Sequence, residues 1–218
     1  MQIQTHIITT IPVFNLSEPL ENLVQFFMDN TFSHVAIVEG EKFLGVFNEN
    51  DLENFEVYKK LEDYRFNLES FFVRKDTSWL DVLETFARNE ANLLPVLDPE
   101  DKVLGYYDIT DIVSVFIETP FFTAPGAILV VAKENKDYSF SEIVQIVESN
   151  NSKFIGGFIS DQRNELVQVT LKISSNNMNE VIQTFRRYNY NILFGNIDDQ
   201  FIDDLKKRSD YLDKYLNV

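Results

Sequence analysis

Two short segments of the chain carry polar residues at the same spacing. GVFNEND, from Gly45, and GYYDITD, from Gly105, each have an amide or a carboxylate at the fourth position and an aspartate at the seventh. These four polar residues are Asn48, Asp51, Asp108 and Asp111. A carboxylate accepts two hydrogen bonds from a diol, and a helix start offers free N–H groups to an anion. The same pattern also resembles a capping box, which closes a helix start without any ligand.

The two segments end a sequence repeat that must position them. Residues 20–30 and 79–89 have matching apolar positions at the spacing of an amphipathic helix. Each is followed by an apolar run, at 34–38 or 93–97, then by a polar turn and a second strand that the glycine opens. The offset is 59 residues before the turn and 60 after it, because the second turn is one residue longer. The pattern predicts two strand-helix-strand-strand-helix repeats in tandem.

Over roughly residues 8–116, this organisation resembles tandem cystathionine-beta-synthase (CBS) domains. The glycines and aspartates carry the resemblance, together with Leu94-Pro95-Val96-Leu97-Asp98, because a proline-containing strand commonly occupies this place in the family. The resemblance implies that the fourth motif position faces a phosphate and that Asp51 or Asp111 holds ribose hydroxyls. Adenine would need an apolar slot, and the candidates, which also fit plain core, are Val38, Val96, Leu97, Tyr106 and Tyr107, with Pro95 in the same strand.

Both motifs depart from the family at the phosphate position, where Ser or Thr is usual. The residue there is neutral Asn48 in the first repeat, with Glu49 beside it, and Asp108 in the second. A second negative charge about 5 Å from Asp108 costs about 3 kcal/mol at an effective dielectric constant near 20. Adenosine, S-adenosylmethionine or a magnesium-chelated phosphate of AMP or ATP escapes most of that penalty. We expect at most one good nucleotide site, and the sequence leaves open which repeat holds it.

The second half of the chain follows another pattern, which begins after Pro120. Its apolar periodicity predicts strand 127–132, helix 139–150, strands 154–160 and 166–174, helix 177–188 and strand 191–195. This βαββαβ order is ferredoxin-like. With the start Pro125-Gly126-Ala127-Ile128-Leu129, it resembles ACT domains, which typically pair side by side and bind amino acids near the first turn. That turn, residues 133–138, has no glycine, so we favour dimerisation over amino-acid binding.

Composition and charge exclude several classes of function. Nineteen Lys and Arg against 35 Asp and Glu give a net charge of −16, which opposes nucleic-acid binding. There is no cysteine, and the only histidines are His6 and His34, so thiol and multi-histidine metal chemistry are not expected. We expect His34 to be a satisfied residue at the edge of the core. No apolar run is long enough for a membrane span, which favours a soluble, cytoplasmic protein.

We interpret the chain as an α+β ligand sensor and not an enzyme. The predicted parts are CBS repeats at 1–62 and 63–120, an ACT-like domain at 121–197 and an amphipathic C-terminal helix at 198–218. The order is similar to that of bacterial acetoin-utilisation proteins of the CBS-CBS-ACT type. An adenosyl ligand, with or without magnesium, would be bound without an obligatory cofactor, and the expected partners are a second copy of the chain and a downstream protein. The alternative is a purely structural interaction module with decayed nucleotide sites, and a metal-dependent enzyme is a third reading.

Overall fold

The structure is a computed structural model that describes residues 3–56, 58–163, 165–174 and 176–195. The chain divides into two compact units, of which unit 1 ends at Glu118 and unit 2 begins at Thr119. The predicted helix at 198–218 lies outside the described residues.

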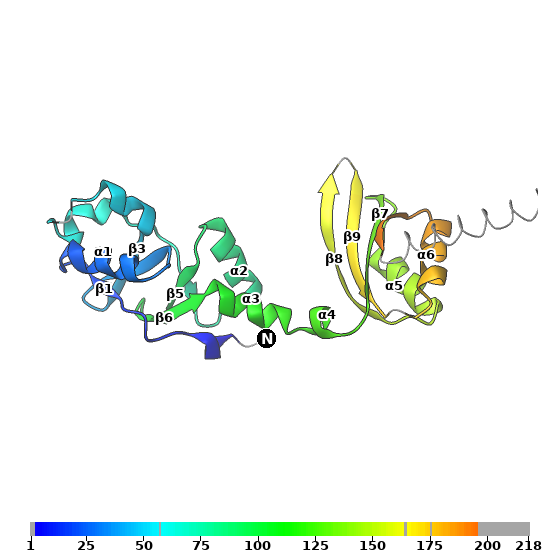
Figure 1. The fold of residues 1–218 in the computed structure, drawn as a ribbon, viewed down its shortest axis with the longest axis horizontal. Coiled ribbons are helices and arrows are strands. Elements are labelled where there is room, and N and C mark those ends of the chain that lie inside the picture. The colour runs from blue at the N-terminus through cyan, green and yellow to red at the C-terminus, as the bar shows by residue number, and fades with distance from the viewer. Residues whose placement is uncertain (1–2, 57, 164, 175, 196–218) are drawn as a thin grey trace, which may run out of the picture. The chain divides into compact units, whose positions relative to one another are not determined.

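Unit 1 is built from two halves with the same order of elements (Figure 1). After the short 3-10 helix η1 (Gln4–His6), the first half contains β1 (Phe14–Asn15), α1 (Leu20–Asp29), β2 (His34–Glu39) and β3 (Lys42–Asn48). The second half contains β4 (Val73–Arg74), α2 (Trp79–Arg88), β5 (Leu93–Leu97) and β6 (Val103–Asp108). Both sheets have a parallel pair followed by an antiparallel pair, in the orders β1-β2-β3 and β4-β5-β6. The predicted repeat is therefore confirmed.

One hydrophobic core runs through both halves of unit 1. Helix α1 buries Leu20, Leu23 and Phe27 against it, as the helical spacing of these residues predicts. Helix α2 buries Val82 and Phe86 and starts at a serine cap, Ser78, whose side chain accepts from a backbone N–H of the first turn. The apolar stripe of each helix is thus what holds it on its sheet.

The two halves differ in the helix that follows the motif. In the second half this is α3 (Ile109–Ile117), which buries Ile112 and Val115. In the first half the chain forms only 3-10 helices, η2 (Glu49–Asn54) and η3 (Leu61–Asn67). The prediction of a regular final helix in both repeats was therefore wrong for the first. Its segment ENDLEN buries no residue, so it lacks the apolar stripe that an α-helix needs.

Equivalent residues of the two halves meet at the boundary between them. The Ser33 N–H donates to Asn92 Oδ1 at 2.7 Å, and the Asn92 N–H donates back to Ser33 Oγ at 2.9 Å. These residues lie 59 positions apart, which is the offset of the repeat before the turn. Lys42 and Lys102, also equivalent, form an isolated antiparallel bridge. Contact between equivalent positions is what an approximate twofold axis requires.

Each sheet also accepts one residue from the segment that leads into the other half. Ile8 and Tyr106 exchange backbone hydrogen bonds of 2.8 and 2.9 Å, and Val46 and Glu69 exchange bonds of 2.9 and 3.0 Å. Ile8 precedes the first half but bonds to β6, whereas Glu69 precedes the second half but bonds to β3. The halves are therefore joined by crossed backbone bridges.

The motif glycines make these bridges sterically possible. A Cβ at Gly45 would lie 2.6 Å from the Glu69 carbonyl oxygen, and one at Gly105 would lie 2.4 Å from the Ile8 carbonyl oxygen. Gly105 also has φ +150°, which few other residues adopt. The expectation that glycine opens the second strand was wrong, because β3 and β6 begin before it. Close approach of another backbone is the reason for glycine here.

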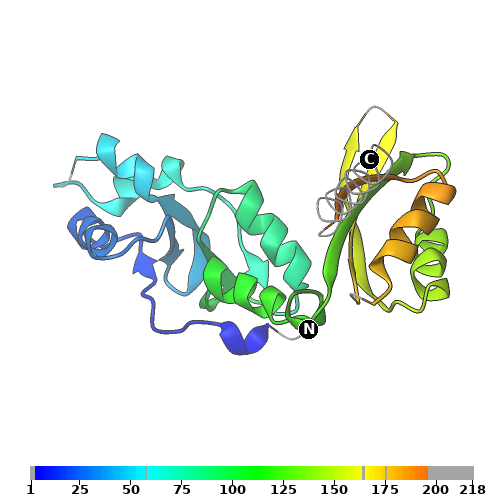
Figure 2. The same cartoon turned by 45° about the vertical axis from the view of Figure 1, so that its right-hand side comes forward.

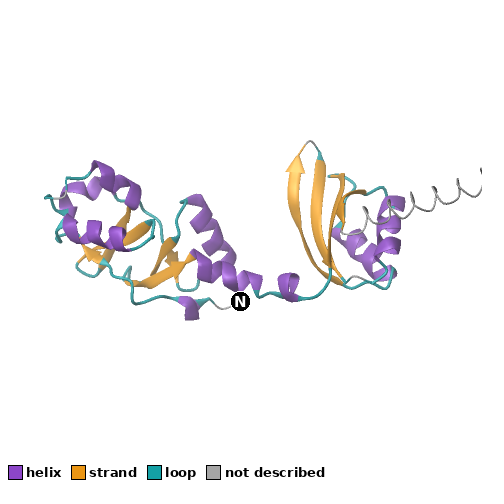
Figure 3. Cartoon of the chain, viewed as in Figure 1, coloured by secondary structure: helices purple, strands orange, loops and turns teal. Residues whose placement is uncertain are grey.

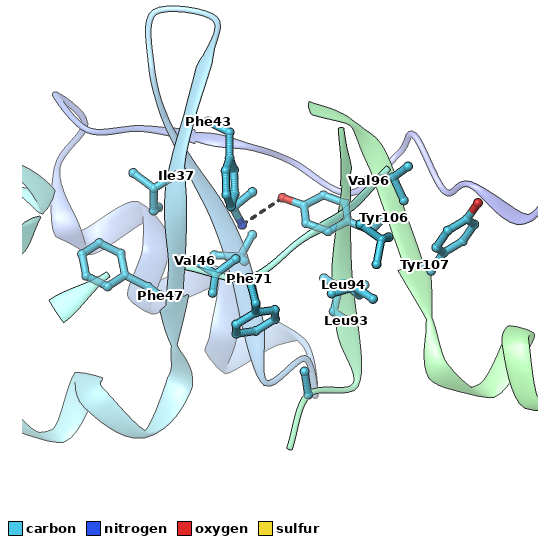
Figure 4. Close-up of a cluster of buried hydrophobic side chains, with 14 of the residues drawn as sticks. Ile37, Phe43, Val46, Phe47, Phe71, Leu93, Leu94, Val96, Tyr106 and Tyr107 are labelled. Atoms are coloured by element: carbon cyan, nitrogen blue, oxygen red, sulfur yellow. Dashed lines mark hydrogen bonds between the residues drawn. The ribbon is translucent and has the colours of Figure 1, made fainter. Parts of the chain in front are cut away.

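Tyr106 adds a side-chain link between the halves. Its hydroxyl donates to the Pro12 carbonyl oxygen at 2.8 Å and accepts from the Ala36 N–H at 3.1 Å. Figure 4 shows the ring reaching from β6 toward the strands of the first half, whereas Tyr107 points away from them. The side chain is fully buried, and burial raises the pKa of the hydroxyl. The equivalent residue of the first half, Val46, cannot form such a link.

Unit 2 has a four-stranded sheet with its two longer helices on one face (Figures 2 and 3). After the single turn α4 (Pro120–Thr123), its elements are β7 (Ala127–Glu134), α5 (Phe140–Ser149), β8 (Phe154–Arg163), β9 (Leu166–Ile173), α6 (Met178–Arg187) and β10 (Asn191–Gly195). The strand order is β10-β7-β9-β8, and all three pairs are antiparallel. The order of elements is the one that the periodicity predicts.

The core of unit 2 forms between the inward side chains of the central strands and the two helices. Strand alternation puts Leu129 and Val131 of β7 on the same face as Val169 and Leu171 of β9. The helices bury Ile143, Ile146, Val147, Val181, Ile182 and Phe185 against them. On the opposite face, α4 packs against β8: the Phe121 ring lies 5.7 Å from the Phe158 ring, and the Lys172 ammonium donates to the Phe122 carbonyl oxygen at 3.1 Å.

Removal of the Tyr106 hydroxyl is predicted to weaken unit 1. Tyr106→Phe leaves the Ala36 N–H without its acceptor, so we expect a loss of about 1 to 3 kcal/mol in the free energy of unfolding. The matched control is Tyr107→Phe, whose buried hydroxyl has no hydrogen-bond partner among the described residues, and we expect no loss there. Urea unfolding followed by the fluorescence of the only tryptophan, Trp79, measures both. Equal losses would contradict the assigned role of Tyr106.

Candidate functional site

The polar residues of the first motif lie where β3 ends. Asn48 is the N-cap of η2, and its Oδ1 accepts from the Asn50 N–H at 3.0 Å. Its Nδ2 donates to Glu69 Oε1 at 3.1 Å. Asp51 is half-buried in the first turn of η2. The end of β3 therefore brings together one amide and two carboxylates.

His34 lies next to this group, because β2 begins where β3 ends and His34 is the register partner of Asn48. The residue is 1% exposed. Its Nδ1 lies 2.8 Å from Ser33 Oγ, which is hydrogen-bond distance. Its Nε2 lies 3.6 Å from Glu69 Oε1, which is too long for a hydrogen bond, and has no other partner among the described residues. The expectation of a satisfied residue at the core edge was therefore wrong for one ring nitrogen.

The charge state of His34 follows from its surroundings. Burial lowers the pKa of the imidazole below its ordinary value of 6.5, while the carboxylates of Glu69 and Asp51 act in the opposite direction and only partly offset it. The ring is therefore neutral at pH 7, and one of its nitrogens is a hydrogen-bond acceptor.

The second motif forms an equivalent but less polar group at the end of β6. Asp108 is the N-cap of α3, and its Oδ1 accepts from the Thr110 N–H at 2.7 Å. Asp111 is half-buried in the first turn of the same helix. The positions equivalent to His34 and Glu69 are occupied by apolar residues: Leu93 is the register partner of Asp108, and Ile8 forms the crossed bridge.

The predicted adenine-slot residues all lie in the core of unit 1. Val38, Pro95, Val96, Leu97, Tyr106 and Tyr107 are buried. They occupy β2, β5 and β6, and the hydroxyl of Tyr106 is already used between the halves. An adenine ring would have to enter beside these side chains, so their role as a slot remains a prediction.

The sequence analysis did not identify Glu69, nor the contact between Glu69 and Nε2 of His34. Glu69 is 21 residues from Asn48 and lies in no recognisable motif, so only the crossed bridge reveals that the two side chains meet. A histidine at the start of an apolar strand is itself a weak signal, because core histidines are common. Comparison of the two repeats could have singled out His34, because the equivalent position of the second repeat is Leu93.

The predicted ligand turn of unit 2, residues 133–138, overlaps the end of β7. A cavity of about 400 Å³ lies there, lined by Lys133, Glu134, Asp137, Leu166, Asn189 and Asn191. The Lys133 ammonium is 2.8 Å from Glu142 Oε2 and 4.4 Å from the centre of the Tyr190 ring. The charge of Lys133 is thus already neutralised by Glu142, and the Lys136 ammonium of the same turn lies 2.8 Å from Glu134 Oε2.

Comparison with known families and structures gives one family match. Residues 63–118 match the model of the CBS domain. The second half of unit 1 is therefore similar to a CBS domain, and the first half repeats its sheet order and its motif spacing, so unit 1 has a CBS pair fold. No curated protein matches the chain.

Several solved structures resemble about half of the chain, at low identity. A CBS domain pair/ACT domain protein from Thermotoga maritima has 19% identity and TM-score 0.49, over 54% of this chain and 98% of that one. The CBS domains of a transcriptional regulator from Streptococcus pneumoniae have 12% identity and TM-score 0.47, over 52% and 98%. CBSX2, solved in complex with AMP, has 14% identity and TM-score 0.45, over 54% and 96%. Each of these matches covers about half of this chain.

The described residues contain no candidate membrane-spanning helix and no candidate metal-binding cluster. None of their helices has the length and apolar character needed to cross a membrane. Within the same residues, no three or more His, Asp or Glu side chains are grouped in a way that could hold a metal ion.

The buried state of His34 predicts acid sensitivity of unit 1. The folded state binds the His34 proton less readily than the unfolded state, so the contribution to stability is present above about pH 6.5 and is lost as the pH falls toward the folded pKa. We expect wild type to lose up to about 1.4 kcal/mol per pH unit more than His34→Leu in this range. Urea unfolding at pH 7.5, 6.5 and 5.5 measures the difference. His6→Leu is the control and should follow wild type, whereas parallel profiles for wild type and His34→Leu would refute the assignment.

Proposed function

We propose that the protein is a non-catalytic regulatory protein whose unit 1 binds an adenosyl ligand. The observation that carries this proposal is the pair of equivalent motifs at the ends of β3 and β6, in a unit with a CBS pair fold. Resemblance to the family assigns the ribose hydroxyls to Asp51 and Asp111. Both carboxylates are half-buried, and neither has a lysine or arginine partner among the described residues, so each has acceptor capacity left for a diol.

The proposed ligand carries no free phosphate at the 5′ position. Asp108 uses the Thr110 N–H that a phosphate would need, and it adds a negative charge at the same place. In the first repeat, Glu69 and Asp51 oppose an anion in the same way, although Asn48 is neutral. A neutral or cationic compound such as adenosine or S-adenosylmethionine fits both groups better than AMP or ATP, unless magnesium neutralises the phosphate.

Unit 2 is proposed to be an ACT-like domain that holds a homodimer or passes the ligand state to a downstream protein. The proposal is supported by its βαββαβ order and by its two edge strands, β8 and β10. Phe158, Ile159 and Phe194 on these strands are 48%, 41% and 54% exposed, as expected for strands that pair with another copy. The proposed setting is the cytoplasm, without contact to a membrane or to nucleic acid.

The proposed mechanism is a shift between two arrangements of the halves of unit 1. A ligand changes their balance only if it binds one arrangement better than the other. Both motifs lie close to the boundary, since Ser33 contacts Asn92 across it and is the chain neighbour of His34. A ligand held at the end of β3 therefore acts on a residue that already joins the halves.

The alternative function is a structural interaction module without a ligand. The specific observation in its favour is that Asn48 and Asp108 both act as helix caps in the absence of any ligand. Such caps stabilise the fold by about 1 kcal/mol each, which is reason enough for these residue types.

Thermal unfolding with a panel of adenosyl compounds distinguishes the two functions. We expect adenosine or S-adenosylmethionine at about 100 times its Kd to add about 2.7 kcal/mol, a shift in Tm of about 5 to 10 °C. AMP and ATP should give smaller shifts unless magnesium is present. If no compound shifts the Tm, the structural module is the correct function.

Two aspartate variants locate the site within unit 1. Asp51→Ala or Asp111→Ala should abolish the shift in the repeat that binds, and Glu100→Gln, in the exposed turn after β5, should leave it unchanged. Asp108→Thr removes the opposing charge and should increase the shift with AMP relative to adenosine. An unchanged preference in Asp108→Thr would contradict the proposed effect of this carboxylate.

A further inference from the structure

A hollow of about 380 Å³ opens on the first half of unit 1, between α1 and η2. Part of its lining is apolar and buried or half-buried, namely Val24, Phe27 and Leu52. The exposed part of its lining includes Met28, Glu49 and Glu53, and the methionine is 77% exposed. The hollow is therefore apolar inside, with a flexible apolar side chain and two carboxylates at its rim.

The second half of unit 1 shows what covers the equivalent face. There α3 packs on α2, and the Phe116 ring lies 5.1 Å from the Trp79 ring. In the first half η2 follows the motif instead, and this 3-10 helix buries no residue. The hollow beside α1 is what this difference leaves open. A helix with an apolar stripe, as α3 has, is the kind of element that fits against such a face.

The rim of the hollow also differs from α3 in charge. Glu49 and Glu53 stand where α3 has Ile109 and Val113, at the offset of 60 residues. Neither glutamate forms an ion pair with a lysine or arginine in the described part of the chain. Two carboxylates beside an apolar hollow favour a partner whose apolar side chains are flanked by positive charges.

A second copy of the chain does not match this rim. Each copy has a net charge of −16, and a twofold contact through the hollow would bring the same glutamates of both copies together. The electrostatic match is with a basic partner.

We propose that the hollow binds an amphipathic helix of another protein. Apolar side chains of that helix enter the hollow and contact Met28, and its lysines or arginines lie against Glu49 and Glu53. The inference goes beyond the proposed function, because this contact requires no adenosyl ligand.

Fluorescence anisotropy of a labelled peptide, titrated with the full chain at physiological salt, tests the charged rim. The peptide consists of leucine and lysine, has about 14 residues, and carries its leucines on one helical face. We expect wild type to bind it, and the double variant Glu49→Gln, Glu53→Gln to bind about fivefold more weakly, because two ion pairs are lost. The matched control is Glu90→Gln, Glu100→Gln, which removes two exposed carboxylates of the second half and should change binding less than about twofold.

The apolar part of the surface is tested at Met28. Met28→Ala copies the second half, which has Ala87 at this position, and should weaken binding about threefold. Leu80→Ala, at an exposed leucine of α2, is the control and should leave binding unchanged. A second peptide of the same composition, with its leucines spread around the helix, should bind more weakly than the amphipathic one.

The proposal is refuted if wild type does not bind the amphipathic peptide or binds both peptides equally well. Equal losses in the Glu49/Glu53 variant and its control would also refute it, since the peptide would then respond only to the overall negative charge. Self-association of the full chain that Met28→Ala abolishes, measured by sedimentation, would make a second copy the occupant. None of these results bears on the adenosyl ligand, which thermal unfolding tests separately.

Discussion

The close approach of two backbones at the motif glycines is the constraint on which unit 1 depends. At Gly45 and Gly105 a carbonyl oxygen from the segment leading into the other half lies where a Cβ would stand, 2.6 and 2.4 Å away. These contacts let each sheet gain a bridge from outside its own half. Because the bridges cross, neither half completes its sheet alone, and one core extends through both.

Within this nearly symmetric frame, a few unequal residues make the two ends different. Tyr106 links the halves with its hydroxyl, while the equivalent Val46 is simply core. The substitution of polar for apolar residues at the end of β3 has a larger chemical effect. His34 and Glu69 stand where the second half has Leu93 and Ile8, so one end carries a buried imidazole beside a carboxylate and the other does not.

The polar end is connected directly to the boundary between the halves. Ser33 Oγ lies 2.8 Å from Nδ1 of the His34 ring, and Ser33 exchanges hydrogen bonds with Asn92 of the other half. A change in the partners of His34 is therefore transmitted through one hydroxyl to the contact between equivalent residues. Such a short connection suits a unit whose proposed output is a change in the arrangement of its halves.

Local pattern in the sequence determined the elements of both units, because apolar periodicity and helix caps act over a few residues. It predicted α1, α2, α5 and α6, the strand order along the chain and the polar residues of the two motifs. It failed for the final helix of the first repeat, where ENDLEN lacks a buried stripe. Only the tertiary structure decided that Glu69 meets His34 and Asn48, since crossed backbone bridges between distant segments leave no local signal.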